Sequence, residues 1–246
     1  MRGLSEQNIL TIWEAGLRQH PVERAITVLT TADPQHSHSD SLALSVGQRD
    51  ARLLAIRECT FGAHFAGYAE CPQCGESLEF TFGADDTRAT APGRENDGQA
   101  FSFRCEDYEV QARLPDSADL LAIAGCRAVP EARALLIERC IARAAHQGTA
   151  ITVSALPDNV IAALGEAAIE RDPQAEIRLE LVCPSCDYRW FAIFDILTFL
   201  WQEIMMHAKR ILYDVHLLAS AYGWSESNIL AMSALRRRMY LEMVSA

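Results

Sequence analysis

Four of the eight cysteines lie in two short motifs whose spacing suits a metal ion. The motifs share the pattern Cys-Pro-x-Cys and are Cys71-Pro72-Gln73-Cys74 and Cys183-Pro184-Ser185-Cys186. A residue that tolerates a positive φ follows each one, Gly75 or Asp187. Two thiolates on such a tight turn provide half of a tetrahedral zinc shell, and a second turn completes it. We therefore predict one Zn²⁺ bound by Cys71, Cys74, Cys183 and Cys186.

The two motifs are far apart in the chain, with 108 residues between Cys74 and Cys183. In a compact zinc ribbon the corresponding gap is about 15–20 residues. The entropy lost on closing a loop rises only with the logarithm of its length, so the longer gap is compatible with one shared site. Because the intervening residues carry their own helical and strand patterns, we predict a zinc ribbon split by an inserted subdomain.

The residues alone leave other interpretations of these cysteines open. A Cys-x-x-Cys pair can be a redox centre, but such a pair begins a helix, and no helical periodicity follows either motif here. The cysteines could also be separate buried thiols, or His64 could replace one ligand. Four thiolates leave no coordination position for a substrate, so we predict a structural zinc and no catalytic residue. A metalloenzyme would need a ligand other than a thiolate.

Alternating apolar residues predict a strand on each side of both motifs. The expected strands cover residues 65–70, 78–82, 177–182 and 188–193. Each cysteine motif, or knuckle, should therefore form the turn of a β-hairpin.

Helical periodicity dominates both ends of the chain. Ser5 and Pro21 should begin two N-terminal helices, followed by a loop over 32–41 and a helix over 48–59. At the other end, residues 197–222 should form one helix of about 26 residues, ended by Gly223. Ser225 and Ser233 should then cap two short closing helices. Between the knuckles, the pattern predicts strands at 101–103 and 108–114 and helices at 119–124 (capped by Ser117), 131–145 and 158–168.

These elements predict an α+β fold that is mostly helical, with a split four-cysteine zinc ribbon and a long C-terminal helix followed by two short ones. The expected units are an N-terminal helical region (1–64), the first half of the ribbon (65–83), an exposed linker (84–99), an inserted α+β subdomain (100–176), the second half of the ribbon (177–195) and a C-terminal helical unit (196–246).

The composition argues against several classes of function. The formal net charge is -11, whereas proteins that bind phosphates through lysine and arginine usually carry the opposite balance. The most apolar stretch, 190–206, contains charged residues, and its longest uncharged run is too short for a membrane span of about 20 residues. No signal peptide is visible, and no motif for a nucleotide or a hydrolase nucleophile occurs. We expect a soluble, cytoplasmic, non-enzymatic protein with no nucleic acid, membrane or small-molecule substrate as partner.

The C-terminal part also contains residues suited to contact with a partner protein. Arg236, Arg237 and Arg238 form the only basic run, which either lies on a solvated helix face or contacts an acidic partner. Tyr222 and Trp224 flank the end of the long helix, where they either belong to the core or line a partner groove. These five residues are our predicted partner-binding set.

Several segments resemble a known family. They are 47–54 (GQRDARLL), both knuckles, 113–120 (RLPDSADL) and the stretch from Val215 to Glu242 with VHLLASAYGWSE and RRRMYLE. Together they are similar to the T-even-type baseplate hub assembly chaperones and baseplate proteins of contractile phage tails and extracellular contractile injection systems. The resemblance implies a role in building the baseplate, as an assembly factor or as a component, with hub, spike or wedge subunits as partners.

Two function classes therefore compete. The first is a baseplate assembly or structural protein that acts in the producing bacterial cell and is stabilised by zinc. The second is a zinc-ribbon nucleic-acid-binding or regulatory protein, which the acidic charge and the lack of basic residues beside the knuckles disfavour.

Overall fold

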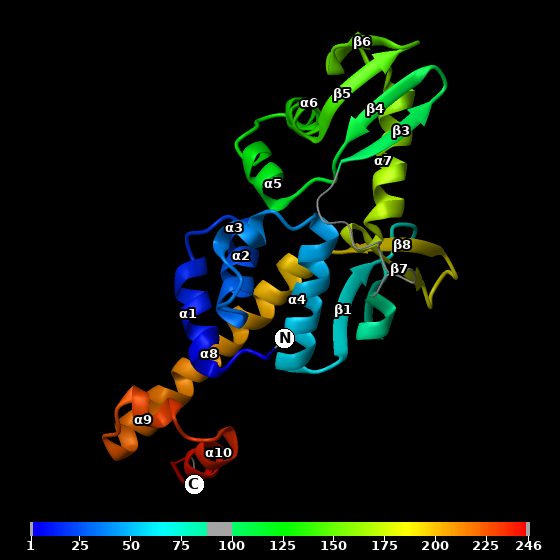
Figure 1. Ribbon diagram of the computed structural model, residues 1–246. Coiled ribbons are helices and arrows are strands. Elements are labelled where there is room, and N and C mark those ends of the chain that lie inside the picture. The colour runs from blue at the N-terminus through cyan, green and yellow to red at the C-terminus, as the bar shows by residue number, and fades with distance from the viewer. Residues whose placement is uncertain (1, 88–99, 245–246) are drawn as a thin grey trace.

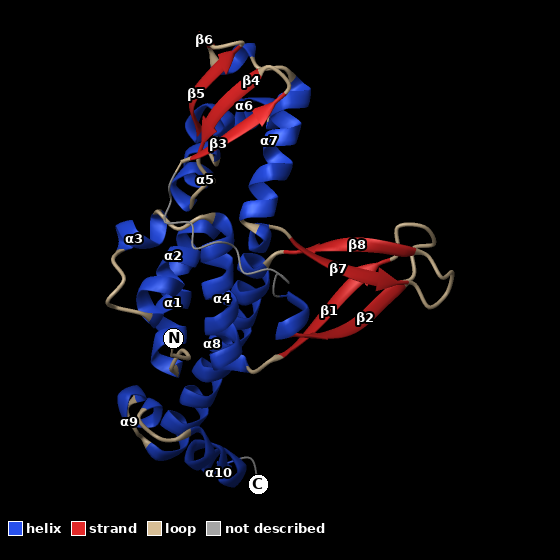
Figure 2. Cartoon of the chain, turned by 45° about the vertical axis from the view of Figure 1, so that its right-hand side comes forward, coloured by secondary structure: helices blue, strands red, loops and turns tan. Residues whose placement is uncertain are grey.

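The computed structural model describes residues 2–87 and 100–244 and has a mixed fold of helices and small antiparallel sheets (Figure 1). A bundle of helices forms the body, and three units project from it (Figure 2). One is a four-stranded sheet with its helices, the second is a pair of β-hairpins, and the third is the end of the chain. Among the described residues, no helix is both long enough and apolar enough to cross a membrane.

The body contains the N-terminal helices and one long helix that runs through them. These helices are α1 (Glu6–Gly16), α2 (Pro21–Ala32), α3 (His38–Leu42), α4 (Val46–Phe61) and α8 (Ile196–Tyr222). The buried positions of α8 recur every three or four residues: Ile196, Leu200, Ile204, Ala208, Ile211, Val215 and Leu218. Fully burying one such side chain contributes about 1.5–3 kcal/mol, so this face holds α8 against α1, α2 and α4.

Local signals set the ends of these helices as predicted. The Ser5 hydroxyl accepts a hydrogen bond from the Asn8 backbone N–H, and the Asn8 side chain accepts one from the Ser5 N–H. Gly223 adopts a left-handed conformation (φ 69°), and its N–H bonds to the Ala219 carbonyl. Beyond it, Ser225 caps α9 (Glu226–Leu230), and Ser233 precedes α10 (Ala234–Val244).

The predicted strands around the knuckles form two antiparallel hairpins. The first pairs β1 (His64–Glu70) with β2 (Ser77–Gly83), and the second pairs β7 (Ile177–Val182) with β8 (Arg189–Phe194). The bases of both hairpins join the core of the body through Phe65 and Ile177, with Phe82 and Phe194 packed against that core.

A separate sheet lies between the hairpins in the sequence. Its strands are β3 (Phe101–Cys105), β4 (Tyr108–Ala112), β5 (Ile141–His146) and β6 (Thr149–Ile151), all antiparallel and in that order. Helices α5 (Ser117–Ile123), α6 (Val129–Cys140) and α7 (Asp158–Arg171) accompany it, with short turns η2 (Val153–Ala155) and η3 (Pro173–Ala175). Its core, which includes Val110, Ile141 and Val160, is distinct from that of the body.

One predicted helix in this unit is wrong over its last third. The pattern predicted helix over 131–145, but α6 ends at Cys140 and the chain continues directly as β5. Pairing with β4, which places Ala144 opposite Val110, overrides the local helical pattern. In addition, Asp116 rather than Ser117 caps α5.

Two predicted loops contain short helices. Part of the loop predicted over 32–41 is α3, which Ser37 caps. Residues 84–87, which we assigned to an exposed linker, form the short helix η1 (Ala84–Thr87), with Ala84 and Thr87 buried. The remainder of that predicted linker, 88–99, lies outside the described residues.

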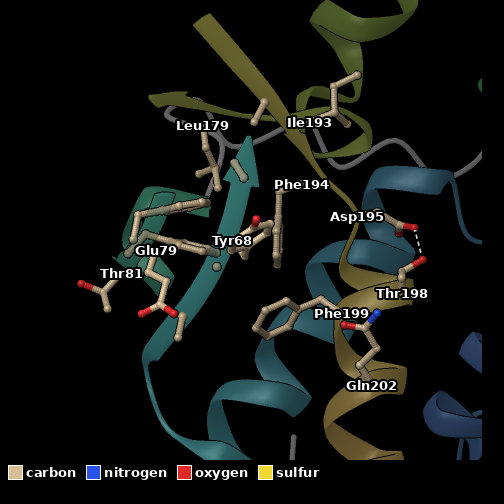
Figure 3. A pocket seen from close by; sticks show the side chains of 16 residues that line it. Tyr68, Glu79, Thr81, Leu179, Ile193, Phe194, Asp195, Thr198, Phe199 and Gln202 are labelled. Carbon is tan, nitrogen blue, oxygen red and sulfur yellow. Dashed lines mark hydrogen bonds between the residues drawn. The ribbon is translucent and has the colours of Figure 1, made fainter. Parts of the chain in front are cut away.

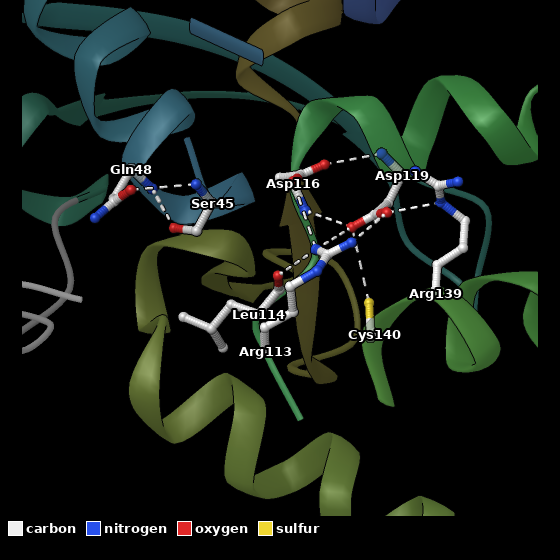
Figure 4. Close-up of polar contacts among 8 residues, drawn as sticks. All are labelled: Ser45, Gln48, Arg113, Leu114, Asp116, Asp119, Arg139 and Cys140. Atoms are coloured by element: carbon white, nitrogen blue, oxygen red, sulfur yellow. Dashed lines mark hydrogen bonds and ion pairs between the residues drawn. The ribbon is translucent and has the colours of Figure 1, made fainter. Parts of the chain in front are cut away.

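A buried ionic network fixes the point where the sheet unit meets the body (Figure 4). Asp119 is fully buried and accepts hydrogen bonds from Arg113 and Arg139. Next to it, the backbone N–H of Val46 donates to the Pro115 carbonyl at 3.1 Å. The sequence predicted a strand end and a helix start in the segment 113–120, but not this ion pairing, although an arginine lies six residues before an aspartate there.

Candidate metal centre

The four predicted ligands lie together at the tips of the two hairpins. Their sulfur atoms all lie within 4.8 Å of one another. Two close separations cross between the knuckles, with Cys71 Sγ 3.7 Å from Cys186 Sγ and Cys74 Sγ 3.6 Å from Cys183 Sγ. The fold therefore brings together two motifs that are separated by more than one hundred residues.

Backbone hydrogen bonds within each turn orient the sulfur atoms. In the first knuckle, the Cys71 N–H donates to the Glu76 carbonyl and the Gly75 N–H donates back to the Cys71 carbonyl. In the second, Cys183 and Asp187 make the equivalent bonds, to Tyr188 and Cys183. Gly75 and Asp187 have φ values of 74° and 55°, which is why glycine or a short polar residue follows each motif. The two knuckles have the same local geometry.

The sulfur separations fit a tetrahedral zinc site. Four sulfurs at about 2.3 Å from one zinc ion lie about 3.8 Å apart. The 3.6 and 3.7 Å distances match that spacing and are well above the roughly 2.05 Å of a disulfide. Cys71 and Cys183 are buried, whereas Cys74 is exposed and Cys186 is intermediate. Four thiols in this arrangement suit one tetrahedral cation.

The thiols differ in how readily they ionise. Burial opposes ionisation of Cys71, but the backbone N–H groups of Cys74 and Gln73 outweigh it and lower its pKa to about 7. At Cys186 the Tyr188 N–H lowers the pKa, but burial and the three neighbouring cysteines prevail and raise it to about 12. Thiolates so close together repel one another, and a divalent cation removes that repulsion.

The structure bears on the alternatives as well. Neither Cys-x-x-Cys pair begins a helix, since both form turns between antiparallel strands. His64 begins β1, where it pairs with Gly83 at the opposite end of the hairpin from Cys71. The remaining cysteines, Cys59, Cys105, Cys126 and Cys140, do not belong to the cluster.

A groove of about 950 Å³ opens between the hairpins and the start of α8 (Figure 3). Aromatic side chains line it, including Phe82, Phe194 and Phe199. At its rim the Thr198 hydroxyl donates to the Asp195 carboxylate at 2.6 Å. The bases of the hairpins also touch beside this groove, where Phe82 of β2 meets the edge of Phe194 of β8 at 5.2 Å.

The predicted partner-binding residues gather in the C-terminal unit but differ in exposure. Tyr222 stacks on Trp224 with ring centroids 4.5 Å apart, and Trp224 meets the edge of Tyr240 at 4.9 Å. Arg236 and Arg238 are exposed, but Arg237 is only 4% exposed and forms an ion pair with Glu6. The local sequence around Arg237 did not predict this ion pair with Glu6.

The fold and the cysteine cluster define the class of protein: it is a helical protein in which two cysteine knuckles meet in space. A family model described as T4 bacteriophage base plate protein matches residues 5–201 of the chain. Because that match covers most of the sequence, the chain belongs to this family and has a structural or assembly role in a phage baseplate. Neither a curated protein nor a solved structure matches it.

The family match covers some of the segments singled out in the sequence and leaves out others. It includes both knuckles and the segments 47–54 and 113–120. It ends at Trp201, near the start of α8, and so leaves out Tyr222, Trp224 and the three arginines.

Proposed function

We propose that the chain is a non-enzymatic assembly factor or structural component of the baseplate of a contractile tail or injection system, and that a structural zinc stabilises it. The family match over residues 5–201 carries this proposal. The protein acts in the cytoplasm of the producing bacterial cell, where tails are built, and contacts hub, spike or wedge subunits through its C-terminal unit.

The zinc contributes stability rather than chemistry in this proposal. Two hairpins with little core of their own meet at their tips through the cysteines, Leu78 and Trp190. Such small units commonly need a metal to hold them together. Cys71, Cys74, Cys183 and Cys186 would hold the ion, and their four thiolates leave no position for a substrate.

The charge at the hairpins supports a protein partner over a nucleic acid. The first hairpin exposes Glu70, Glu76 and Glu79. On the second, Arg178 and Arg189 are paired with Glu176 and Glu180. A zinc ribbon that binds phosphates needs unpaired basic residues at such positions.

Deletion of the gene from the phage or injection-system cluster tests the proposal. We expect electron micrographs of lysates to show few or no complete contractile particles, and a plasmid copy to restore them. Mass spectrometry of purified particles then separates a component from an assembly factor. Normal numbers of functional particles from the deletion strain would contradict the proposal.

A further inference from the structure

A cleft in the C-terminal unit has the opposite charge to the rest of the molecule. It has a volume of about 380 Å³ and lies between α1, α8 and α10. Residues 204–246 contain five of the 22 lysines and arginines but only three of the 33 acidic residues. The remainder of the chain is therefore strongly acidic and disfavours an acidic partner, whereas this segment favours one.

The cleft contains more positive than negative side chains. Arg210, Arg237 and Arg238 line it, against the carboxylates of Glu6 and Asp214. Arg210 and Arg238 are exposed at its mouth. The Arg238 guanidinium pairs with Glu242 at 3.2 Å, but both side chains are more than half exposed, so a partner can exchange this contact at little cost.

The innermost arginine is incompletely paired. Arg237 is 4% exposed, and its Nη2 atom binds the Glu6 carboxylate. Its Nη1 atom is buried and has no hydrogen-bond partner among the described residues. A buried guanidinium nitrogen without an acceptor is costly. A carboxylate of a partner in the cleft would compensate the charge of the Arg237 guanidinium.

Apolar side chains adjoin the charged ones. Leu235, which lines the cleft, is 73% exposed, and Met239 and Met243 continue the same face of α10 at intervals of four residues. On α8, Met206 and Tyr213 are about 60% exposed on either side of Arg210. An apolar face bordered by arginines complements a segment that alternates acidic and apolar residues.

We propose that the cleft between α8 and α10 binds an acidic, amphipathic segment of another baseplate protein, with carboxylates at Arg210 and Arg238 and apolar side chains at Leu235. This rests on the proposed function and names the chemistry of the partner. It also distinguishes among the arginines of the basic run. Arg238 lines the cleft, whereas Arg236 lies outside it, 5.9 Å from the Tyr240 ring.

The test uses the full chain and the individually purified baseplate proteins encoded beside it. Binding of each to the wild type is measured by biolayer interferometry, and the one that binds serves as the probe. We expect the double variant Arg210→Glu/Arg238→Glu to weaken its binding at least tenfold. Arg236→Glu, which makes the same charge change on α10 outside the cleft, should alter binding less than twofold. Circular dichroism checks that all variants are folded.

A chemical readout identifies the partner's side of the contact. Lys209, the single lysine of the chain, is exposed and directly precedes Arg210. A zero-length carbodiimide couples its amine to a carboxylate within contact distance. We expect the partner peptide coupled to Lys209 to contain aspartate or glutamate interleaved with apolar residues, and Lys209→Arg to remove that crosslink.

Each other outcome has a definite meaning. If a baseplate protein binds the double charge-reversal variant as tightly as the wild type, the cleft is not its site and the proposal about the cleft is wrong, while the proposed function stands. If the double variant instead abolishes a dimer seen by sedimentation, or loses binding to a 20-base-pair DNA duplex, the occupant is wrongly assigned. If no baseplate protein binds the wild type, the proposed function itself loses support.

Discussion

The four knuckle cysteines share one environment, yet they are not equivalent. Cys183 is fully buried and Cys74 is exposed. Because the inner sulfurs are shielded from water, loss of an inner ligand from the proposed zinc site would leave a buried, poorly coordinated ion. Loss of an outer ligand lets water enter the vacant position.

Replacement of one inner ligand tests the metal centre. We expect Cys183→Ser to lower bound zinc well below one ion per chain. It should reduce the melting temperature by roughly 6–12 °C, the shift that corresponds to about 3 kcal/mol in a chain of this size. Plasma mass spectrometry gives the zinc content, and calorimetry gives the melting temperature.

Cys126→Ser is the matched control, since Cys126 lies outside the cluster and is partly exposed. It should keep one zinc per chain. Equal zinc contents in the two variants, or a wild-type protein purified under reducing conditions without metal, would rule out the four-thiolate site.

A second residue, Asp50, predicts a dependence of stability on pH. Its carboxylate accepts a hydrogen bond from Arg49 at 2.7 Å, but burial dominates and raises its pKa from 3.8 to about 6. The folded state therefore binds a proton more tightly than the unfolded state does. The resulting contribution to stability is complete below about pH 4 and is lost as the pH rises through 6.

We expect Asp50→Asn to remove this component. Between pH 4 and pH 7 the wild type should lose about 2–3 kcal/mol of its free energy of unfolding through Asp50, which corresponds to the pKa shift. The variant should not lose this contribution, so its stability relative to the wild type should rise by that amount. Urea titrations at both pH values measure it. A difference between the two proteins that does not change with pH would contradict the assigned pKa of Asp50.

Helix α4 shows how a helix is fitted to its neighbour at a single glycine. The Gly47 N–H donates to the Asp172 carboxylate at 2.8 Å, and α4 packs there against η3. A Cβ atom at Gly47 would lie 2.1 Å from Asp172 Oδ1 and 2.8 Å from the Ala175 backbone nitrogen. The body and the sheet unit thus approach closely only because this position lacks a side chain.

Two glycine substitutions separate packing from helix propensity. Gly47→Ala should destabilise the protein by about 1–3 kcal/mol, because the overlap with the Asp172 carboxylate and the Ala175 backbone nitrogen exceeds the gain in propensity. Gly165→Ala in α7, where a new Cβ meets nothing within 4 Å, should instead stabilise it by roughly 0.5–1 kcal/mol. Chemical denaturation of both variants measures the difference, and the same sign for both would contradict the close approach at Gly47.

The whole molecule consists of a helical body with projecting units that differ in how they are secured. The hairpins are anchored to the body at their bases by an aromatic cluster, with Phe65 stacked on Phe82 at 4.9 Å. At their tips only the knuckles and a few side chains hold them together. The sheet unit has its own core, and the C-terminal unit is fixed by the Arg237–Glu6 pair.

Removal of zinc should therefore loosen one end of the hairpins without unfolding the body. After chelation of the reduced protein, we expect amides near 70–77 and 182–189 to exchange hydrogen at least tenfold faster. Amides in the middle of α8 should be affected much less than those of the hairpin tips. Mass spectrometry of deuterium uptake checks this, and uniform loss of protection would show that the zinc supports the global fold.

The amino-acid sequence by itself determined the features that depend on neighbouring residues. The proposed ligands Cys71 and Cys183 follow from residue type and spacing, and the ends of α1 and α8 follow from Ser5 and Gly223. The family match confirms the baseplate assignment made from short motifs.

Only the tertiary structure decided the features that depend on distant partners. The switch from α6 to β5 at Cys140 arises from pairing with β4, which local periodicity does not contain. The burial of Arg237 depends on Glu6, 231 residues away, and the position of Asp119 depends on two arginines. Such contacts form because the packed fold excludes water from these charged groups, and a buried charge is stable only when it is paired. No short stretch of sequence specifies which partner a buried charge will have.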